Sequence, residues 1–139
     1  MREYTELRNR HQKRVNDFLS KYAFFAFDQE QFHEGLDRLQ IRKDDAVQFC
    51  PGGYMIRSRL PEYIKLAEDL RKERDLAAKE PEFAFDMFRY ELANHEYSYT
   101  GSSEDAIDAL GYTFDEIRAD PVLKEALNKA INELMKEEK

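Results

Sequence analysis

A carboxylate and an imidazole stand four residues apart in this chain, at Glu91 and His95. On a helix, residues at this spacing lie on the same face. Such a pair can bind a metal ion or exchange a proton with a substrate. No HExxH motif accompanies it, and the other histidines, His11 and His33, have no partner at metal-ligand spacing. The sequence therefore favours a structural pair, and it predicts no catalytic residue, no metal site and no cofactor.

The stretch around this pair, residues 85–101, is dense in aromatic residues. Tyr90 has the helical spacing of a core residue, whereas Tyr97 and Tyr99 fall at the end of a predicted helix and in the following loop. Tyrosine combines a large ring with a hydroxyl group, which suits protein interfaces. The sequence leaves burial and partner contact open for these two tyrosines, and we take them as candidate anchors at an interface.

Charge is unevenly distributed along the chain. The net charge is −7, but residues 1–21 carry six basic and three acidic residues, whereas residues 75–139 carry seven basic and sixteen acidic residues. An acidic surface repels phosphate and suits a basic protein partner. The excess of acidic residues over residues 75–139 is also explained by solubility alone. The candidate partner-binding acids are Asp105, Asp108, Asp115 and Glu116.

Residues 105–117 have the pattern of two short helices joined at Gly111, with Thr113 as the cap of the second. DNA-binding helix-turn-helix motifs share this pattern. Here the second helix opens with Asp115 and Glu116, which would repel the DNA backbone, so we expect an ordinary helical corner. The basic first helix keeps open an alternative contact with nucleic acid through four of its basic residues: Arg8, Arg10, Lys13 and Arg14.

Hydrophobic periodicity and turn residues predict the other elements. The aromatic run 22–27 suits a short buried strand or an extended linker, and Pro51, Gly52 and Gly53 indicate the turn of a β-hairpin within residues 41–58. Helices are expected over residues 2–21, after Asp28, from Leu60, from Pro81, before Gly111, after Thr113 and after Asp120, with a loop over 98–103. The predicted fold is mainly α, about six helices with a small β-hairpin, in a single domain over residues 1–139.

The aromatic residues are expected to supply much of the core, because each ring buries a large area. In particular, we expect the run Phe24–Phe27 to share one core with Phe83, Met87 and Phe88.

The single cysteine, Cys50, excludes an internal disulfide framework and is typical of a reducing compartment. No apolar run approaches the length of a membrane span, and the first residues lack the apolar core of a signal peptide. We therefore expect a cytoplasmic protein without a membrane partner. The sequence does not predict the oligomeric state.

Four segments, residues 24–35, 52–53, 90–97 and 109–111, resemble a family of small proteins from phages, prophages and gut-bacterial mobile elements. The resemblance covers about residues 15–120. This family is defined by sequence, without an agreed activity, so the resemblance implies no catalytic residue. By analogy, small acidic proteins of mobile elements often block host defence nucleases, including CRISPR effectors.

The leading functional hypothesis is a non-enzymatic binding protein from a phage or mobile element, acting in the host bacterial cytoplasm. It would inhibit a host defence protein such as a CRISPR nuclease by covering a basic surface, with Tyr97 and Tyr99 as anchors. Nucleic acid is not the expected direct partner. Two alternatives remain open: a nucleic-acid-binding accessory protein that uses the basic first helix, and a metal-dependent or acid–base enzyme that uses Glu91 and His95.

Overall fold

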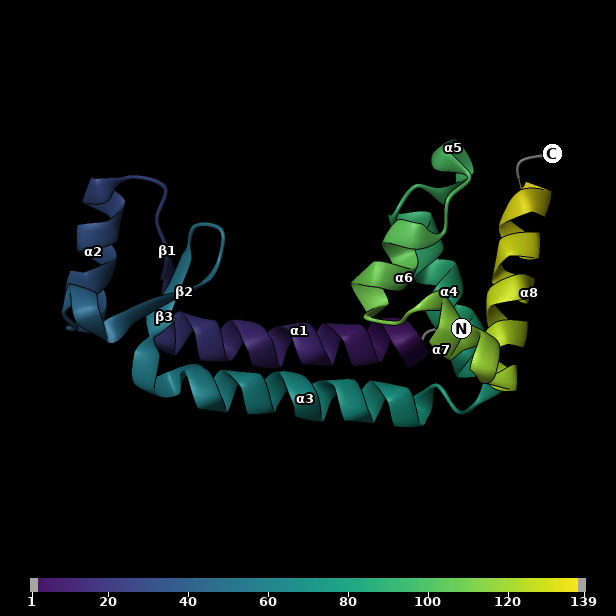
Figure 1. Ribbon diagram of the computed structural model, residues 1–139, viewed down its shortest axis with the longest axis horizontal. Helices are drawn as coiled ribbons and strands as arrows, with labels where there is room; N and C mark the ends of the chain where they lie inside the picture. The colour runs from purple at the N-terminus through teal and green to yellow at the C-terminus, as the bar shows by residue number, and fades with distance from the viewer. Residues whose placement is uncertain (1–2, 138–139) are drawn as a thin grey trace. The chain divides into compact units, whose positions relative to one another are not determined.

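The computed structural model describes residues 3–137, except the side chains of residues 98 and 99, and shows a mainly α-helical protein with one small sheet (Figure 1). The elements are α1 (Glu3–Tyr22), β1 (Ala23–Phe25), α2 (Gln29–Leu39), η1 (Lys43–Asp45), β2 (Ala46–Cys50), β3 (Gly53–Ile56), η2 (Arg57–Arg59), α3 (Leu60–Ala77), α4 (Pro81–Asn94), α5 (Tyr97–Thr100), α6 (Glu104–Leu110), α7 (Phe114–Ala119) and α8 (Pro121–Glu137). The predicted fold class is confirmed.

The chain divides into two compact units. The helical unit contains residues 3–8 and 72–137 of the described chain, and the sheet unit contains residues 9–71. Two helices, α1 and α3, each contribute residues to both units. The single domain over residues 1–139 stays a prediction.

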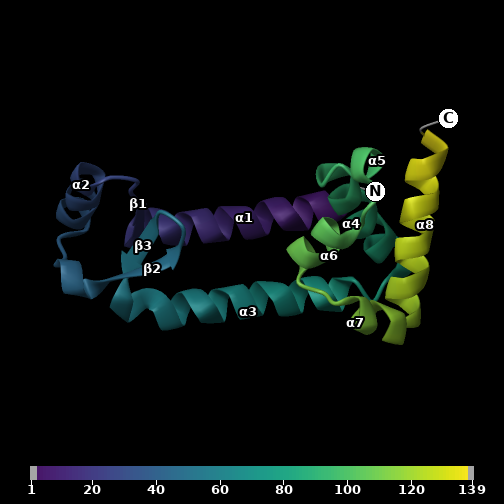
Figure 2. The same cartoon turned by 45° about the horizontal axis from the view of Figure 1, so that its top comes forward.

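The helical unit is built around α4, which packs against α6 and α8. Its core includes Met87, Phe88 and Leu92, all with no exposed surface. Burial of one whole face of α4 follows from the apolar residues at three- and four-residue steps along it. In Figures 1 and 2, α8 runs beside α4.

The sheet unit contains a separate core of Phe24, Ala26 and Leu36. The predicted common core of Phe24–Phe27 with Phe83, Met87 and Phe88 is therefore wrong. Apolar residues indicate burial, but they do not specify which distant segments are buried together.

The predicted hairpin is present and gains a third strand. The antiparallel sheet has the order β1-β3-β2, so β3 lies in the centre. In β1, Phe24 lies opposite Tyr54 and the two rings stack, with centroids 5.5 Å apart. The Phe24 ring also approaches α2 at Gly35, where an added Cβ would lie 2.1 Å from the ring. This close approach accounts for a glycine inside a helix, where glycine is otherwise unfavourable.

The local signals of turns and caps are largely confirmed. Gly52 has φ of +75° between β2 and β3, and Asp28 accepts a hydrogen bond from the Gln31 N–H at the start of α2. Thr113 and Glu116 form the capping box of α7, while Asp120 accepts from two N–H groups of α8. The predicted loop over residues 98–103 is partly wrong, because α5 forms one helical turn over Tyr97–Thr100.

Candidate functional site

The carboxylate of Glu91 is buried in the helical unit, where Glu91 is only 6% exposed. Its partners come from the first turns of α1. The phenol of Tyr4 lies beside Glu91, and Arg8 Nε lies 3.9 Å from Glu91 Oε1. Glu91 Oε1 is buried and has no hydrogen-bond partner within residues 3–137. Burial, and then the negative charge of Glu91, raises the pKa of Tyr4 well above its usual range. The nearby Arg8 guanidinium offsets part of the cost of burying the Glu91 charge.

His95 is not a side-chain partner of Glu91. Helix α4 ends at Asn94, and His95 is its cap with φ of −102° and ψ of 24°. Its backbone N–H donates to the Glu91 carbonyl at 2.9 Å, but no hydrogen bond or ion pair joins the two side chains within residues 3–137. The expected pair therefore does not form, and the buried Glu91 carboxylate lies near Arg8 of α1 instead.

The part of the chain that the structure describes contains no evident metal site. No group of three or more His, Cys, Asp or Glu side chains is placed there to hold a metal ion. The Glu91 cluster contains one carboxylate, one phenol and one guanidinium. Of these, only the carboxylate is a ready metal ligand, so the cluster is better suited to hold α1 against α4 than to bind a metal.

The acidic corner, defined as Asp105, Asp108, Asp115 and Glu116, lies on the exposed surface of α6 and α7. Gly111 has φ of +77° at the end of α6 and turns the chain toward α7. All four acids are exposed.

The charges of the acidic corner are engaged to different degrees. The carboxylate of Glu116 accepts the Thr113 N–H at 3.0 Å, and Asp115 forms an ion pair with Arg118. Asp105 and Asp108 take part in no ion pair within residues 3–137. The large apolar ring of Phe114, which directly precedes Asp115 in the chain, is 44% exposed. The corner thus presents free negative charge together with an aromatic ring.

The two candidate tyrosines differ in what the structure describes. Tyr97 is half-buried and packs against the core of the helical unit. The side chain of Tyr99 lies outside the described residues. As a result, Tyr97 offers only part of its ring to a partner.

The basic first helix is less available than its sequence suggests. Arg8 is held by Glu91 and also lies over the Tyr90 ring, 5.2 Å from its centroid. Lys13 and Arg14 are exposed. Arg8 is therefore partly engaged by Glu91 and Tyr90, and its side chain is 37% exposed.

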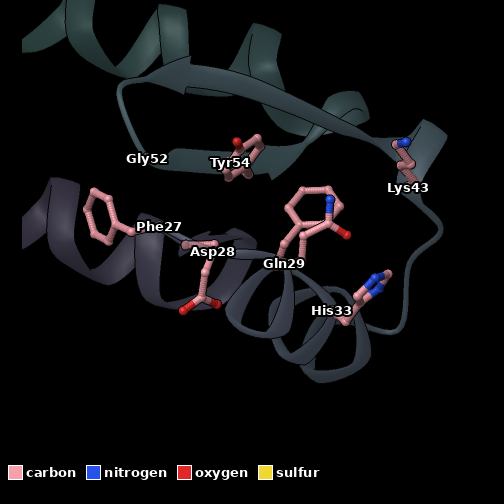
Figure 3. Close-up of a pocket in the computed structure, with 9 residues that line it drawn as sticks. Phe27, Asp28, Gln29, His33, Lys43, Gly52 and Tyr54 are labelled. Atoms are coloured by element: carbon pink, nitrogen blue, oxygen red, sulfur yellow. The ribbon is translucent and has the colours of Figure 1, made fainter.

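A hollow of about 540 Å³ in the sheet unit was not anticipated from the sequence (Figure 3). It lies between the start of α2, η1 and the β2–β3 turn, with Tyr54, His33 and Lys43 among its lining residues. Phe27 stands at one side of it and is 80% exposed. Its volume falls within the usual range of ligand pockets. The only signal in the sequence was the aromatic run ending at Phe27, since Lys43 is brought near by the fold.

Fold and surfaces together define a small, mainly α-helical protein with an acidic helical corner in one unit and a hollowed sheet surface in the other. The chain belongs to a family of unknown function (DUF7659), whose profile matches residues 3–133. No curated protein matches the chain, and no solved structure does. Within residues 3–137, no helix has both the length and the apolar character needed to cross a membrane.

Proposed function

We propose that this protein is a non-enzymatic binding protein whose acidic corner covers a basic surface on a partner protein. The observation that carries the proposal is the exposure of Asp105 and Asp108 without an ion pair in the described chain. An unpaired surface carboxylate keeps its charge available to a cationic partner, and this attraction accelerates encounter. The exposed ring of Phe114 adds apolar area that a partner can bury.

The local structure also supports a binding role for the corner. Gly111 and the capping box of Thr113 and Glu116 fix the chain between α6 and α7. A surface that is already ordered loses little conformational entropy on binding. Tyr97 and Tyr99 remain proposed anchors, with Tyr97 contributing its exposed part.

We further propose that the partner is a host defence protein. Resemblance to proteins of phages and gut-bacterial mobile elements favours a host defence protein, such as a CRISPR nuclease, in the bacterial cytoplasm. The basic grooves by which nucleases hold nucleic acid have the charge that the acidic corner would complement.

The experiment is capture from a bacterial lysate followed by titration of the identified partner at two salt concentrations. Asp105→Lys/Asp108→Lys should weaken binding mainly through slower association, and added salt should weaken binding of the unmodified protein. The matched control is Glu68→Lys/Glu133→Lys, which changes the net charge equally at two exposed positions outside the corner.

Three outcomes contradict the proposal. Equal affinity of the corner variant and the unmodified protein would reject the acidic corner as the contact. Binding of nucleic acid that is lost in Lys13→Glu/Arg14→Glu would favour the basic face of α1 instead. Turnover of a substrate that disappears in His95→Ala, with folding preserved, would favour the enzyme alternative.

A further inference from the structure

One edge of the sheet lies at β1, which is an outer strand, like β2, in the order β1-β3-β2. In an antiparallel ladder, residues alternately direct their N–H and C=O groups toward one neighbouring strand and away from it. The Ala26 N–H donates to the Gly52 carbonyl at 2.8 Å, so residue 26 faces β3. Phe24 lies two residues before Ala26, so its N–H and C=O also point toward β3. The N–H and C=O of Phe25 point away from the sheet.

Most of this edge is already covered by side chains of α2. Arg38 donates to the Ala23 carbonyl at one end of β1, and Gln31 Oε1 accepts the Phe27 N–H at 2.8 Å beyond its other end. Between them, no hydrogen bond within residues 3–137 uses the N–H or C=O of Phe25. The edge therefore offers one donor and one acceptor at a single, defined position.

A groove of about 670 Å³ runs along this edge, and it is called the edge groove here. Its floor is β1, one wall is the last turns of α1 and the other wall is α2. Figures 1 and 2 show β1 continuing from the end of α1 and lying near α2. The α1 wall includes the apolar side chain of Leu19, and the α2 wall includes Glu34. Glu34 is exposed and takes part in no ion pair within the described chain.

We propose that the edge groove binds an extended segment of a partner protein, which adds a short strand to β1. Backbone N–H and C=O groups of the segment pair with those of Phe25, in the manner of other β-strand additions. Successive side chains of a strand point to opposite faces. One face of the segment therefore meets Leu19 and suits an apolar residue, while the other meets Glu34 and suits lysine or arginine.

An extended segment fits this site better than a second copy of the chain. In a second copy, β1 lies at the floor of its own groove between α1 and α2, so two such edges would be kept apart by four helix walls. A segment without flanking helices has no such obstruction. This inference concerns the sheet unit and does not rest on the acidic corner of the helical unit.

The probe is an acetylated, amidated peptide of eight residues in which valine and lysine alternate. NMR amide spectra of the full chain should show the Phe25 N–H shifting and becoming protected from hydrogen exchange as peptide is added. Two further peptides carry N-methyl groups on alternate residues, one on the valines and one on the lysines. Only one of them loses the N–H that faces the Phe25 carbonyl, and that peptide should bind about 2- to 13-fold more weakly, which is the effect of losing one backbone hydrogen bond.

Matched protein variants separate the contributions of backbone and side chain. Phe25→Pro removes the outward N–H at an edge position that tolerates proline, whereas Phe25→Ala removes the ring and keeps the N–H. The proline variant should lose peptide binding by a larger factor than the alanine variant. Glu34→Lys should also weaken binding, while Glu30→Lys, an equal change on α2 outside the groove lining, should not.

Three results would overturn the proposal: no shift of the Phe25 amide at millimolar peptide, equal binding of the two N-methylated peptides, or protection of Phe25 that rises with protein concentration alone. The last result would assign the edge to a second copy. Asp105→Lys/Asp108→Lys should leave peptide binding unchanged, so failure at the acidic corner and failure at the edge groove are distinguishable.

Discussion

Tyr4 shows how one buried residue links the start of α1 to α4. Its ring packs against Phe83 and Tyr90, with centroids 5.8 and 5.6 Å away, and its phenol lies beside the buried Glu91. Ionising this phenol would place a second negative charge beside Glu91 in a region with little water. The pKa of Tyr4 is raised for these two reasons, burial first and the Glu91 charge second.

We predict that this raised pKa makes the protein less stable in strong alkali. The unfolded chain releases the Tyr4 proton above a pH of about 10, whereas the folded protein retains it. The free energy of unfolding is therefore unaffected below that pH and falls above it, by up to about 1.4 kcal/mol per pH unit from this residue.

Urea unfolding between pH 8 and pH 11 measures this loss, with Tyr4→Phe as the control that keeps the ring and removes the titrating group. The variant should lose less stability over this range than the unmodified protein. Parallel losses in the two proteins would mean that Tyr4 titrates alike in the folded and unfolded states.

At the scale of the element, the β2–β3 turn depends on Gly52. Its φ of +75° is a conformation that residues with a Cβ rarely adopt. An added Cβ would also lie 2.4 Å from the Phe27 ring. Phe27 is highly exposed and can swing away, so the backbone conformation is the larger obstacle.

We predict that Gly52→Val destabilises the protein by more than about 1 kcal/mol, because valine is branched at Cβ and is poorly tolerated at positive φ. Chemical denaturation measures the change. A second measurement in the Phe27→Ala background should recover only a small part of the loss. Full recovery would show that the ring contact, and not φ, fixes glycine at this position.

Elements specified by adjacent residues were predictable from the sequence. The caps at Asp28, Thr113 and Asp120 and the turn at Gly52 follow from hydrogen bonds or backbone preferences within a few residues. Strand β1 remained ambiguous because its pairing with β3 joins segments about 30 residues apart. A three-residue strand has no periodicity of its own to reveal that pairing.

In the candidate sites, too, features set by adjacent residues were predictable, and features set by distant residues were not. Exposure of the acidic corner agrees with its charge pattern, since all four acids are exposed. The contact of Glu91 with Arg8, by contrast, joins residues 83 positions apart. The edge groove likewise requires α1, β1 and α2 to be assembled. The sequence singled out Glu91 as a candidate functional residue, but its contact with Arg8 depends on the tertiary fold.

For the whole molecule, two helices connect the stability of the two units. In α1, Tyr4 and Leu7 are buried in the core of the helical unit, whereas Phe18 contacts the Tyr63 ring of the sheet unit at 5.8 Å. In α3, Tyr63 belongs to the sheet unit, and Asp75 of the helical unit accepts a hydrogen bond from the Tyr112 hydroxyl at 3.0 Å. Unfolding either unit would remove contacts that hold part of each helix.

We therefore predict that Phe88→Ala lowers the stability of both units together. Phe88 is fully buried in the helical unit, and deleting such a ring costs about 3–5 kcal/mol. Amide signals of β3 and of α8, followed by NMR during urea unfolding, should keep a common midpoint that moves to lower urea. The control is Phe27→Ala, which removes an exposed ring and should leave the midpoint nearly unchanged. If β3 kept its original midpoint while α8 unfolded earlier, the units would be independently stable, and the continuity of α1 and α3 would not couple them.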